Sequence, residues 1–180
     1  MNGPLRLQPL NTATFSNYCE IGEQAYREHY LHLWPEKDPS PYLKSSFTTA
    51  VLKNEVSDPA TFHFIIRNKQ EGIGIAKLVR NKGFKEFPDT NSILLEKIYL
   101  LQRFTGKGCG TQVLEQLETY AKGLGMRYIW LATMKKGEAL KFYQKLGYSI
   151  RGEQILPFEN ARPEEKGMYI LAKEVFTAVP

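Results

Sequence analysis

The chain has 180 residues, of which 42% are hydrophobic and 24% charged, enough for one sizeable hydrophobic core. We therefore predict a single domain over residues 1–180. The formal charge of +5 comes from 24 basic and 19 acidic residues that are scattered along the chain. A protein that binds nucleic acid needs a basic stripe, so no nucleic-acid partner is expected.

No apolar run reaches the length of about 18 residues that a membrane-spanning helix requires. The first residues also lack the apolar stretch of a secretory signal. Two cysteines, Cys19 and Cys109, are too few for a disulfide framework. We expect a cytoplasmic protein with no membrane partner.

The first half of the chain predicts a strand, two helices and a strand hairpin. Residues 5–10 form the strand, and apolar residues at helical spacing predict a helix over 12–34, ending before Pro35. A second helix is expected over 42–56. The hairpin strands are expected at 61–68 and 72–81.

The second half alternates between strands and helices. After a polar loop, an apolar strand is predicted over 92–101, and apolar positions from Val113 to Leu124 define an amphipathic helix. The remaining elements are a strand at 128–133, a helix at 138–147 capped by Gly147, and strands at 148–156 and 167–175. The predicted order is β-α-α-β-β-β-α-β-α-β-β, a mixed α/β fold with an antiparallel half followed by a crossover helix.

Three alternating glycines, Gly106, Gly108 and Gly110, precede the helix that contains Val113. Glycines allow sharp turns and close approach, and a helix N-terminus presents unpaired amides with partial positive charge. We therefore predict an anion site here. The P-loop pattern fails because Leu101 replaces its first glycine, and the dinucleotide pattern fails because Thr111 replaces its last. A glycine-rich turn without a ligand is the alternative.

Two segments resemble the cofactor-binding motifs of the GNAT superfamily of N-acetyltransferases. "IYLLQRFTGKGCGTQVLEQL", residues 98–117, resembles its loop Arg/Gln-x-x-Gly-x-Gly/Ala, which binds the diphosphate of acetyl-CoA. "YIWLATMKKGEALKFYQKLGY", residues 128–148, resembles its second cofactor segment. The predicted element order matches the superfamily fold over residues 5–175, and the resemblance implies a central, mostly antiparallel sheet that splays at the cofactor site, with flanking helices. "LEKIYLL", "RYIWL" and "FYQKLGY" look most like the branch of polyamine acetyltransferases typified by PaiA.

The resemblance implies where acetyl-CoA binds. The implied contacts lie on the strand end and the glycine loop, at Ile98, Tyr99, Leu100, Arg103, Thr105, Gly106, Lys107, Gly108, Cys109, Gly110 and Thr111. Arg103 to Gly108 fits the pattern literally, but we prefer the register that places Gly108 and Gly110 in the first helical turn. Thr105 then occupies the family's Arg/Gln position. Lys136 stands where many members have an asparagine that bonds the pantetheine arm, so backbone groups are expected to hold that arm.

Acetyl transfer to an amine requires a base, because an amine with a pKa of about 10 is protonated at pH 7. Glu96 lies within an apolar strand, where burial would raise its pKa. The resemblance implies that it acts as base, often through water. An ion pair between Glu96 and a nearby cation on a half-exposed strand is the alternative.

The resemblance also implies that Tyr143 protonates the departing thiolate of coenzyme A. A packed core aromatic is the alternative for Tyr143. A strand amide between Ile98 and Leu100 is expected to stabilise the negative charge on the carbonyl oxygen.

The acceptor side is expected along the first helix and the segment after it. Aromatic rings and carboxylates suit a cationic amine, and this region contains Tyr26, Tyr30, Trp34, Tyr42, Glu28, Glu36 and Asp38. His29 and His32 stand at i and i+3, but their spacing shows no third ligand, so no metal is expected.

The predicted function is acetyl-CoA dependent transfer to the primary amine of a small molecule, a polyamine among the candidates, by direct attack in a ternary complex. A peptide or protein amine is one alternative acceptor. A non-catalytic acyl-CoA binding module is the alternative of a different class. Enzymes that the chain resembles often dimerise through their last strands, so the resemblance allows a homodimer.

Overall fold

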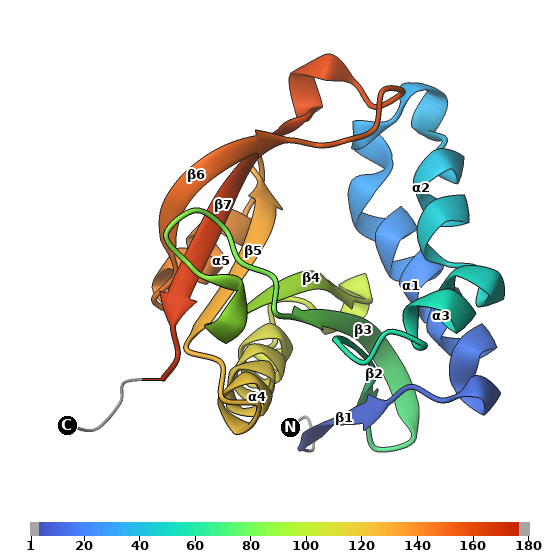
Figure 1. Cartoon of the computed structure of the whole chain (residues 1–180). Coiled ribbons are helices and arrows are strands. Elements are labelled where there is room, and N and C mark those ends of the chain that lie inside the picture. Colours follow the sequence, from blue (N-terminus) through green and yellow to red (C-terminus); the bar gives the residue numbers. More distant parts are fainter. Residues whose placement is uncertain (1–3, 177–180) are drawn as a thin grey trace.

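The computed structural model describes residues 4–176 and contains a seven-stranded sheet with helices on both faces (Figure 1). The strand order is β1-β2-β3-β4-β5-β7-β6, and every neighbouring pair is antiparallel except β4 and β5. The strands are β1 (Leu5–Pro9), β2 (Thr61–Asn68), β3 (Glu71–Arg80), β4 (Ser92–Leu100), β5 (Tyr128–Met134), β6 (Ser149–Ile155) and β7 (Gly167–Glu174). The predicted mixed α/β fold with a mostly antiparallel sheet is confirmed.

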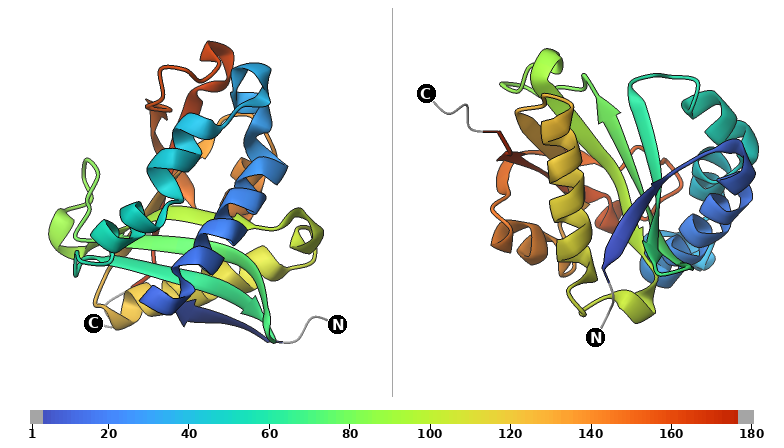
Figure 2. Two further views of the ribbon diagram at one scale, coloured as in Figure 1. Left: turned by 90° about the vertical axis from the view of Figure 1, so that its right-hand side faces the viewer. Right: turned by 90° about the horizontal axis from the view of Figure 1, so that it is seen from below.

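Helices cover the two faces of the sheet unequally (Figure 2). The α-helices are α1 (Phe15–Tyr30), α2 (Ser40–Ser46), α3 (Thr49–Glu55), α4 (Cys109–Gly123) and α5 (Ala139–Lys145). Helices α1 to α3 bury one hydrophobic core against the sheet, and α4 and α5 bury a second core on the opposite face. None of the helices within residues 4–176 is long and apolar enough to cross a membrane.

Two helix predictions were wrong in detail. The helix predicted over 42–56 is two helices, because the chain leaves helical geometry at Phe47 and Thr48. Thr48 Oγ1 accepts the amide of Val51 at 3.2 Å and so caps the N-terminus of α3. The first helix ends at Tyr30, not at residue 34, and continues only as a 3-10 turn over Leu31–Leu33.

Strands β4 and β5 separate in the middle of the sheet. They pair in parallel only from Ser92 to Leu94 on β4 and from Tyr128 to Trp130 on β5. Beyond these residues β4 continues to Leu100, pairing only with β3, and β5 continues to Met134, pairing only with β7. The backbone edges that face each other across this opening therefore have no strand partner within the described residues.

Candidate active site

Strand β4 contains a β-bulge at Glu96. Lys97 pairs with Lys77 of β3, and Leu95 pairs with the next β3 residue, Leu78. Glu96 is therefore an extra residue with no pairing partner on β3. A bulge bends its strand and reverses the alternation of side chains. The strand predicted over 92–101 contained no bulge, although two adjacent charged residues in an apolar strand are a signal for such an irregularity.

The bulge places Glu96 and Lys97 on the same face of the sheet. Leu95 belongs to the core under α4 and Ile98 packs against that core. The ammonium of Lys97 instead lies over the ring of Phe47, on the α1 to α3 side, 5.3 Å from its centroid. Glu96 binds Lys77. Two consecutive residues therefore present a carboxylate and an amine on the face that was expected to receive the acceptor.

Lys77 is the centre of a charged cluster beneath α1 and α3. Its Nζ lies 2.7 Å from Glu55 Oε1 and also contacts Glu96 Oε2. The other Glu55 oxygen lies 3.2 Å from His63 Nε2, and His63 Nδ1 lies 3.1 Å from the hydroxyl of Tyr18. Burial alone would lower the pKa of Lys77, but its bonds to the two carboxylates outweigh burial and raise it.

The geometry of Glu96 agrees with the alternative that the sequence left open. Its side chain is 37% exposed and pairs with Lys77, so the expectation of a buried carboxylate was wrong. The bulge explains the difference, because it turns Glu96 away from the core under α4. The role of Glu96 as a base remains a prediction.

We expect Glu55→Gln to destabilise the protein at neutral pH and much less in acid. Burial opposes ionisation of Glu55, yet the bonds to His63 and Lys77 lower its pKa from 4.5 to about 2. Because the folded-state pKa is depressed, the carboxylate stabilises the fold above pH 4.5, and this contribution is lost as the pH falls toward 2. Urea unfolding at pH 7 and pH 2.5 measures both differences.

Glu23→Gln is the matched control, because Glu23 pairs with Arg27 on the exposed face of α1. Such a surface pair contributes about 0.2–1 kcal/mol. An equal loss of stability for Glu55→Gln at both pH values would contradict the assigned ion pairs.

Four tyrosines gather between α1, α2 and β4. The rings of Tyr26 and Tyr42 stack at 4.1 Å between centroids, and Tyr30 and Tyr99 meet edge to face at 5.6 Å. The hydroxyls of Tyr42 and Tyr99 lie 2.7 Å apart. Burial raises the pKa of both phenols, so these groups stay protonated. The predicted acceptor aromatics therefore do lie together, joined by Tyr99 from the strand.

Two other residues expected on the acceptor side, Trp34 and Asp38, make local hydrogen bonds instead. Trp34 is fully buried, and its Nε1 donates to the hydroxyl of Tyr26 at 3.1 Å. Asp38 accepts the amide of Ser40 at the start of α2. Glu36 is exposed.

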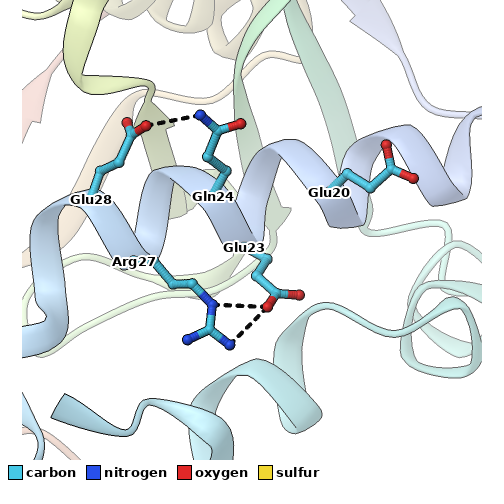
Figure 3. Close-up of a pocket in the computed structure, with 5 residues that line it drawn as sticks. All are labelled: Glu20, Glu23, Gln24, Arg27 and Glu28. Atoms are coloured by element: carbon cyan, nitrogen blue, oxygen red, sulfur yellow. Dashed lines mark hydrogen bonds and ion pairs between the residues drawn. The ribbon is translucent and has the colours of Figure 1, made fainter.

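The last turn of α1 is bonded to the end of β4. Figure 3 shows the outer face of this helix, where Gln24 donates to Glu28 beside a shallow hollow. The second Glu28 oxygen accepts the amide of Gln102 at 2.6 Å. His29 Nε2 lies 2.9 Å from the carbonyl oxygen of Leu100 and must donate to it, because a carbonyl only accepts.

The glycine loop adopts the conformations that its composition predicts. Gly106 and Gly108 have φ of 69° and 78°, in the left-handed region that favours glycine. Gly108 immediately precedes α4. The first helical hydrogen bond of α4 runs from the Gln112 amide to the Gly108 carbonyl. The amides of Gly110 and Thr111 come before it, in the first turn, where amides have no helical acceptor. The loop therefore offers amides and partial positive charge to an anion.

Two side chains predicted to assist this loop have local partners. Arg103 pairs with Glu71 at 2.6 Å, and the Thr105 hydroxyl donates to the Gln102 carbonyl at 2.8 Å. Lys107 is exposed beside the loop. Cys109 is fully buried in the core under α4. Lys136 pairs with Glu165 at 2.8 Å.

Helix α5 packs Tyr143 beside the start of α4. A Cβ on Gly110 would lie 3.2 Å from the ring of Phe142, so the two helices meet closely there. Tyr143 is 8% exposed and contacts Phe142 and Tyr148, with ring centroids 5.1 and 5.7 Å away. Burial, and to a lesser degree Tyr30, raises the pKa of Tyr143. Its phenol is therefore a proton donor at neutral pH.

Ile98 faces the opening between β4 and β5. The Leu101 amide bonds to Ile73 of β3, and backbone groups alternate in direction along a strand. Tyr99 therefore also faces β3, whereas the amides and carbonyls of Ile98 and Leu100 face β5. The Leu100 carbonyl accepts a hydrogen bond from His29. Ile98 directs both its amide and its carbonyl to the edge where β4 has no strand partner.

These parts fit an extended ligand with an anionic group at one end. The helix start suits the anion, and the open strand edges suit amide groups. No group of three or more histidine, cysteine or acidic side chains that could hold a metal occurs within residues 4–176.

Residues 23–148 match the model of the acetyltransferase (GNAT) family. A protein described as an N-acetyltransferase in the pepI 3' region of Lactobacillus delbrueckii is 26% identical over 120 residues, or 66% of this chain and 69% of its own. The N-alpha-acetyltransferase 80 of Mus musculus is 35% identical over 74 residues, which cover 40% of this chain and 22% of the mouse protein.

Solved structures share the fold at low sequence identity. The PaiA N-acetyltransferase of Thermoplasma acidophilum in complex with coenzyme A has a TM-score of 0.72 and 16% identity, covering 94% of this chain and 98% of its own. The spermidine/spermine N-acetyltransferase SpeG of Vibrio cholerae has a TM-score of 0.69 and 16% identity, covering 97% and 94%.

Proposed function

The chain belongs to the GNAT acetyltransferase family, and we propose that it transfers the acetyl group of acetyl-CoA to the primary amine of a small molecule by direct attack in a ternary complex. The observation that carries the proposal is the opening between β4 and β5. The glycine loop begins just beyond the end of β4, and Tyr143 lies on the helix that packs against the start of α4.

The glycine loop and the strand edges hold acetyl-CoA in this proposal. The amides of Gly110 and Thr111 bind the diphosphate, with Lys107 near enough along the chain to add positive charge. The edges of β4 and β5 bind the amides of the pantetheine arm, in place of the strand partner that each lacks. The Ile98 amide donates to the thioester carbonyl and stabilises the charge that develops on it.

Tyr143 and Glu96 manage the protons. Tyr143 donates its proton to the sulfur as the carbon–sulfur bond breaks, and the raised pKa of its phenol keeps that proton available. Glu96 receives one proton of the acceptor ammonium, directly or through one water. The second proton, which the nitrogen loses after its attack on the thioester, replaces the one that Tyr143 gives to the sulfur. Lys77 fixes the carboxylate from the other side.

The acceptor in this proposal is a cationic alkylamine, a polyamine among the candidates. The tyrosine cluster offers aromatic faces that attract a cation. The name of one structural neighbour, the spermidine N-acetyltransferase SpeG, suits such an acceptor. A peptide or protein amine is the second candidate, because one stretch of the chain is similar to an N-alpha-acetyltransferase.

A homodimer through the last strands is part of the same proposal. Strand β6 is the edge of the sheet, and it exposes 71% of Ile155.

We expect release of free thiol from acetyl-CoA in the presence of alkylamines. The assay compares short monoamines, diamines, spermidine, spermine and peptides with free N-termini, each with and without the protein. Turnover with small amines above the amine-free background supports the proposal, and turnover with peptides alone shifts the acceptor class. Binding of acetyl-CoA in calorimetry without turnover of any amine would identify an acyl-CoA binding module instead.

A further inference from the structure

The last turn of α1 bonds to the end of β4 through two consecutive side chains, Glu28 and His29, and we infer that both are positioning residues for the acetyl-CoA site. They fix the stretch of backbone over which β4 ends and the glycine loop is approached. This inference rests on the proposed function, because it assigns two residues of α1 to the cofactor site of that proposal.

The two side chains bond to backbone groups that lie two residues apart. His29 Nε2 donates to the carbonyl oxygen of Leu100 at 2.9 Å, and Glu28 Oε2 accepts the amide of Gln102 at 2.6 Å. The bonded residues are 71 and 74 positions apart in the sequence, so both bonds are tertiary contacts. One side chain donates and the other accepts, so together they fix the position and the direction of this backbone.

The bonded stretch lies between the two parts of the proposed cofactor site. Ile98, which directs its amide and carbonyl to the open edge of β4, comes two residues before Leu100. A 3-10 turn over Gln102–Phe104 follows, and the first glycine of the loop is Gly106. No strand pairs with this edge of β4 beyond Leu94 within the described residues. The bonds from α1 therefore hold the end of β4 on the side where β5 has left it.

The same turn of α1 also relates the cofactor edge to the proposed acceptor cluster. Because the His29 imidazole lies against the Leu100 carbonyl, the Ile98 carbonyl is the next one along this edge that can accept an amide of the pantetheine arm. Tyr30 follows His29, and its ring meets that of Tyr99 on β4 at 5.6 Å between centroids. A shift of this turn would move the acceptor cluster and the cofactor edge relative to each other, and a misplacement of about 1 Å can cost about 100-fold in rate.

His29→Phe tests the inference, because phenylalanine keeps a planar ring but cannot donate to the Leu100 carbonyl. The variant should lose about fivefold in affinity for acetyl-CoA, the factor that one ordinary hydrogen bond contributes. His29→Gln should stay within about twofold of the wild type, because its side-chain amide supplies a donor in place of the imidazole. Calorimetry with acetyl-CoA in the absence of any amine measures both affinities.

His32→Phe is the matched control. It makes the same substitution three residues later, at an exposed position, and should leave the affinity for acetyl-CoA unchanged. Glu28→Leu and Glu28→Gln form a second pair, because glutamine keeps an oxygen that can accept the Gln102 amide and leucine does not. Leucine should weaken acetyl-CoA binding more than glutamine.

A second measurement separates positioning from a general loss of stability. Hydrogen exchange of the free protein, followed by mass spectrometry, should become faster over residues 98–111 in His29→Phe and stay as in the wild type over β2. Unchanged affinity in His29→Phe, an equal loss in His29→Gln, or faster exchange along the whole chain would overturn the inference. Wild-type protein that binds no acetyl-CoA would instead count against the proposed function.

Discussion

Tyr143→Phe should abolish most of the turnover while leaving the fold and the affinity for acetyl-CoA almost unchanged. The substitution keeps the ring that packs against Phe142 and Tyr148, and removes only the hydroxyl. Loss of a general acid costs a factor of about 100 to 10,000 in rate, or roughly 3–5 kcal/mol of barrier. An ordinary hydrogen bond contributes only about 1 kcal/mol to stability. Steady-state kinetics, a melting curve and a cofactor titration measure the three quantities.

Tyr148→Phe is the matched control, because it removes the neighbouring phenol from the same core. The Tyr148 hydroxyl donates to Glu118 at 3.1 Å, and Lys173 binds the same carboxylate at 2.8 Å. We expect this variant to lose stability and keep its turnover, the reverse of Tyr143→Phe. A loss of less than about fivefold in Tyr143→Phe would be too small for a general acid, and would make Tyr143 a packing residue.

The parts of the site that the sequence predicts are those encoded within short segments. Alternating glycines before an amphipathic helix predict positive φ angles in the loop, and Gly106 and Gly108 indeed have positive φ. Tyr143 falls on a short helix whose spacing and glycine cap are local signals. The break at Thr48 is also local, since a threonine before a helical segment is an N-cap signal, but the apolar spacing across it concealed the boundary.

The charged cluster could not be predicted, because it depends on strand pairing. Glu55, Lys77 and Glu96 are about twenty residues apart in the sequence, and only the hairpin and the capped helix α3 bring them together. Whether Glu96 is buried depends on the bulge, which is set by how β4 aligns with β3. Lys77 in the middle of an apolar strand was the available signal, because a buried lysine requires a counter-charge.

The separation of β4 and β5 likewise has no signature in either strand. Both read as apolar runs, and periodicity does not show where a parallel pair stops. The likeness of the whole chain to known acetyltransferases implied a cofactor site at this place. The described structure supplies the open backbone that such a site needs.

Gly108→Val should reduce the affinity for acetyl-CoA by about 5- to 30-fold, which corresponds to about 1–2 kcal/mol. Gly108 has φ of 78°, and a Cβ there would meet no atom within 4 Å. The Cβ of valine therefore has room, and the expected effect comes from the backbone conformation. The left-handed conformation costs an L-residue roughly 1–2 kcal/mol, and is a genuine outlier for a β-branched one. The loop must either store this strain or turn its amides away from the diphosphate.

Two controls separate this backbone effect from the mere addition of a side chain. Asparagine tolerates the left-handed region better than other residues, so Gly108→Asn should retain most of the affinity. Gly123→Val adds the same side chain near the end of α4, where φ is not positive and no atom lies within 4 Å of a Cβ, and should leave the affinity unchanged. Calorimetry with acetyl-CoA and a melting curve on each variant measure binding and folding separately. If Gly108→Val binds acetyl-CoA as tightly as the wild type and also melts at the same temperature, the diphosphate does not depend on the conformation of this loop, because the strain must otherwise appear in binding or in folding.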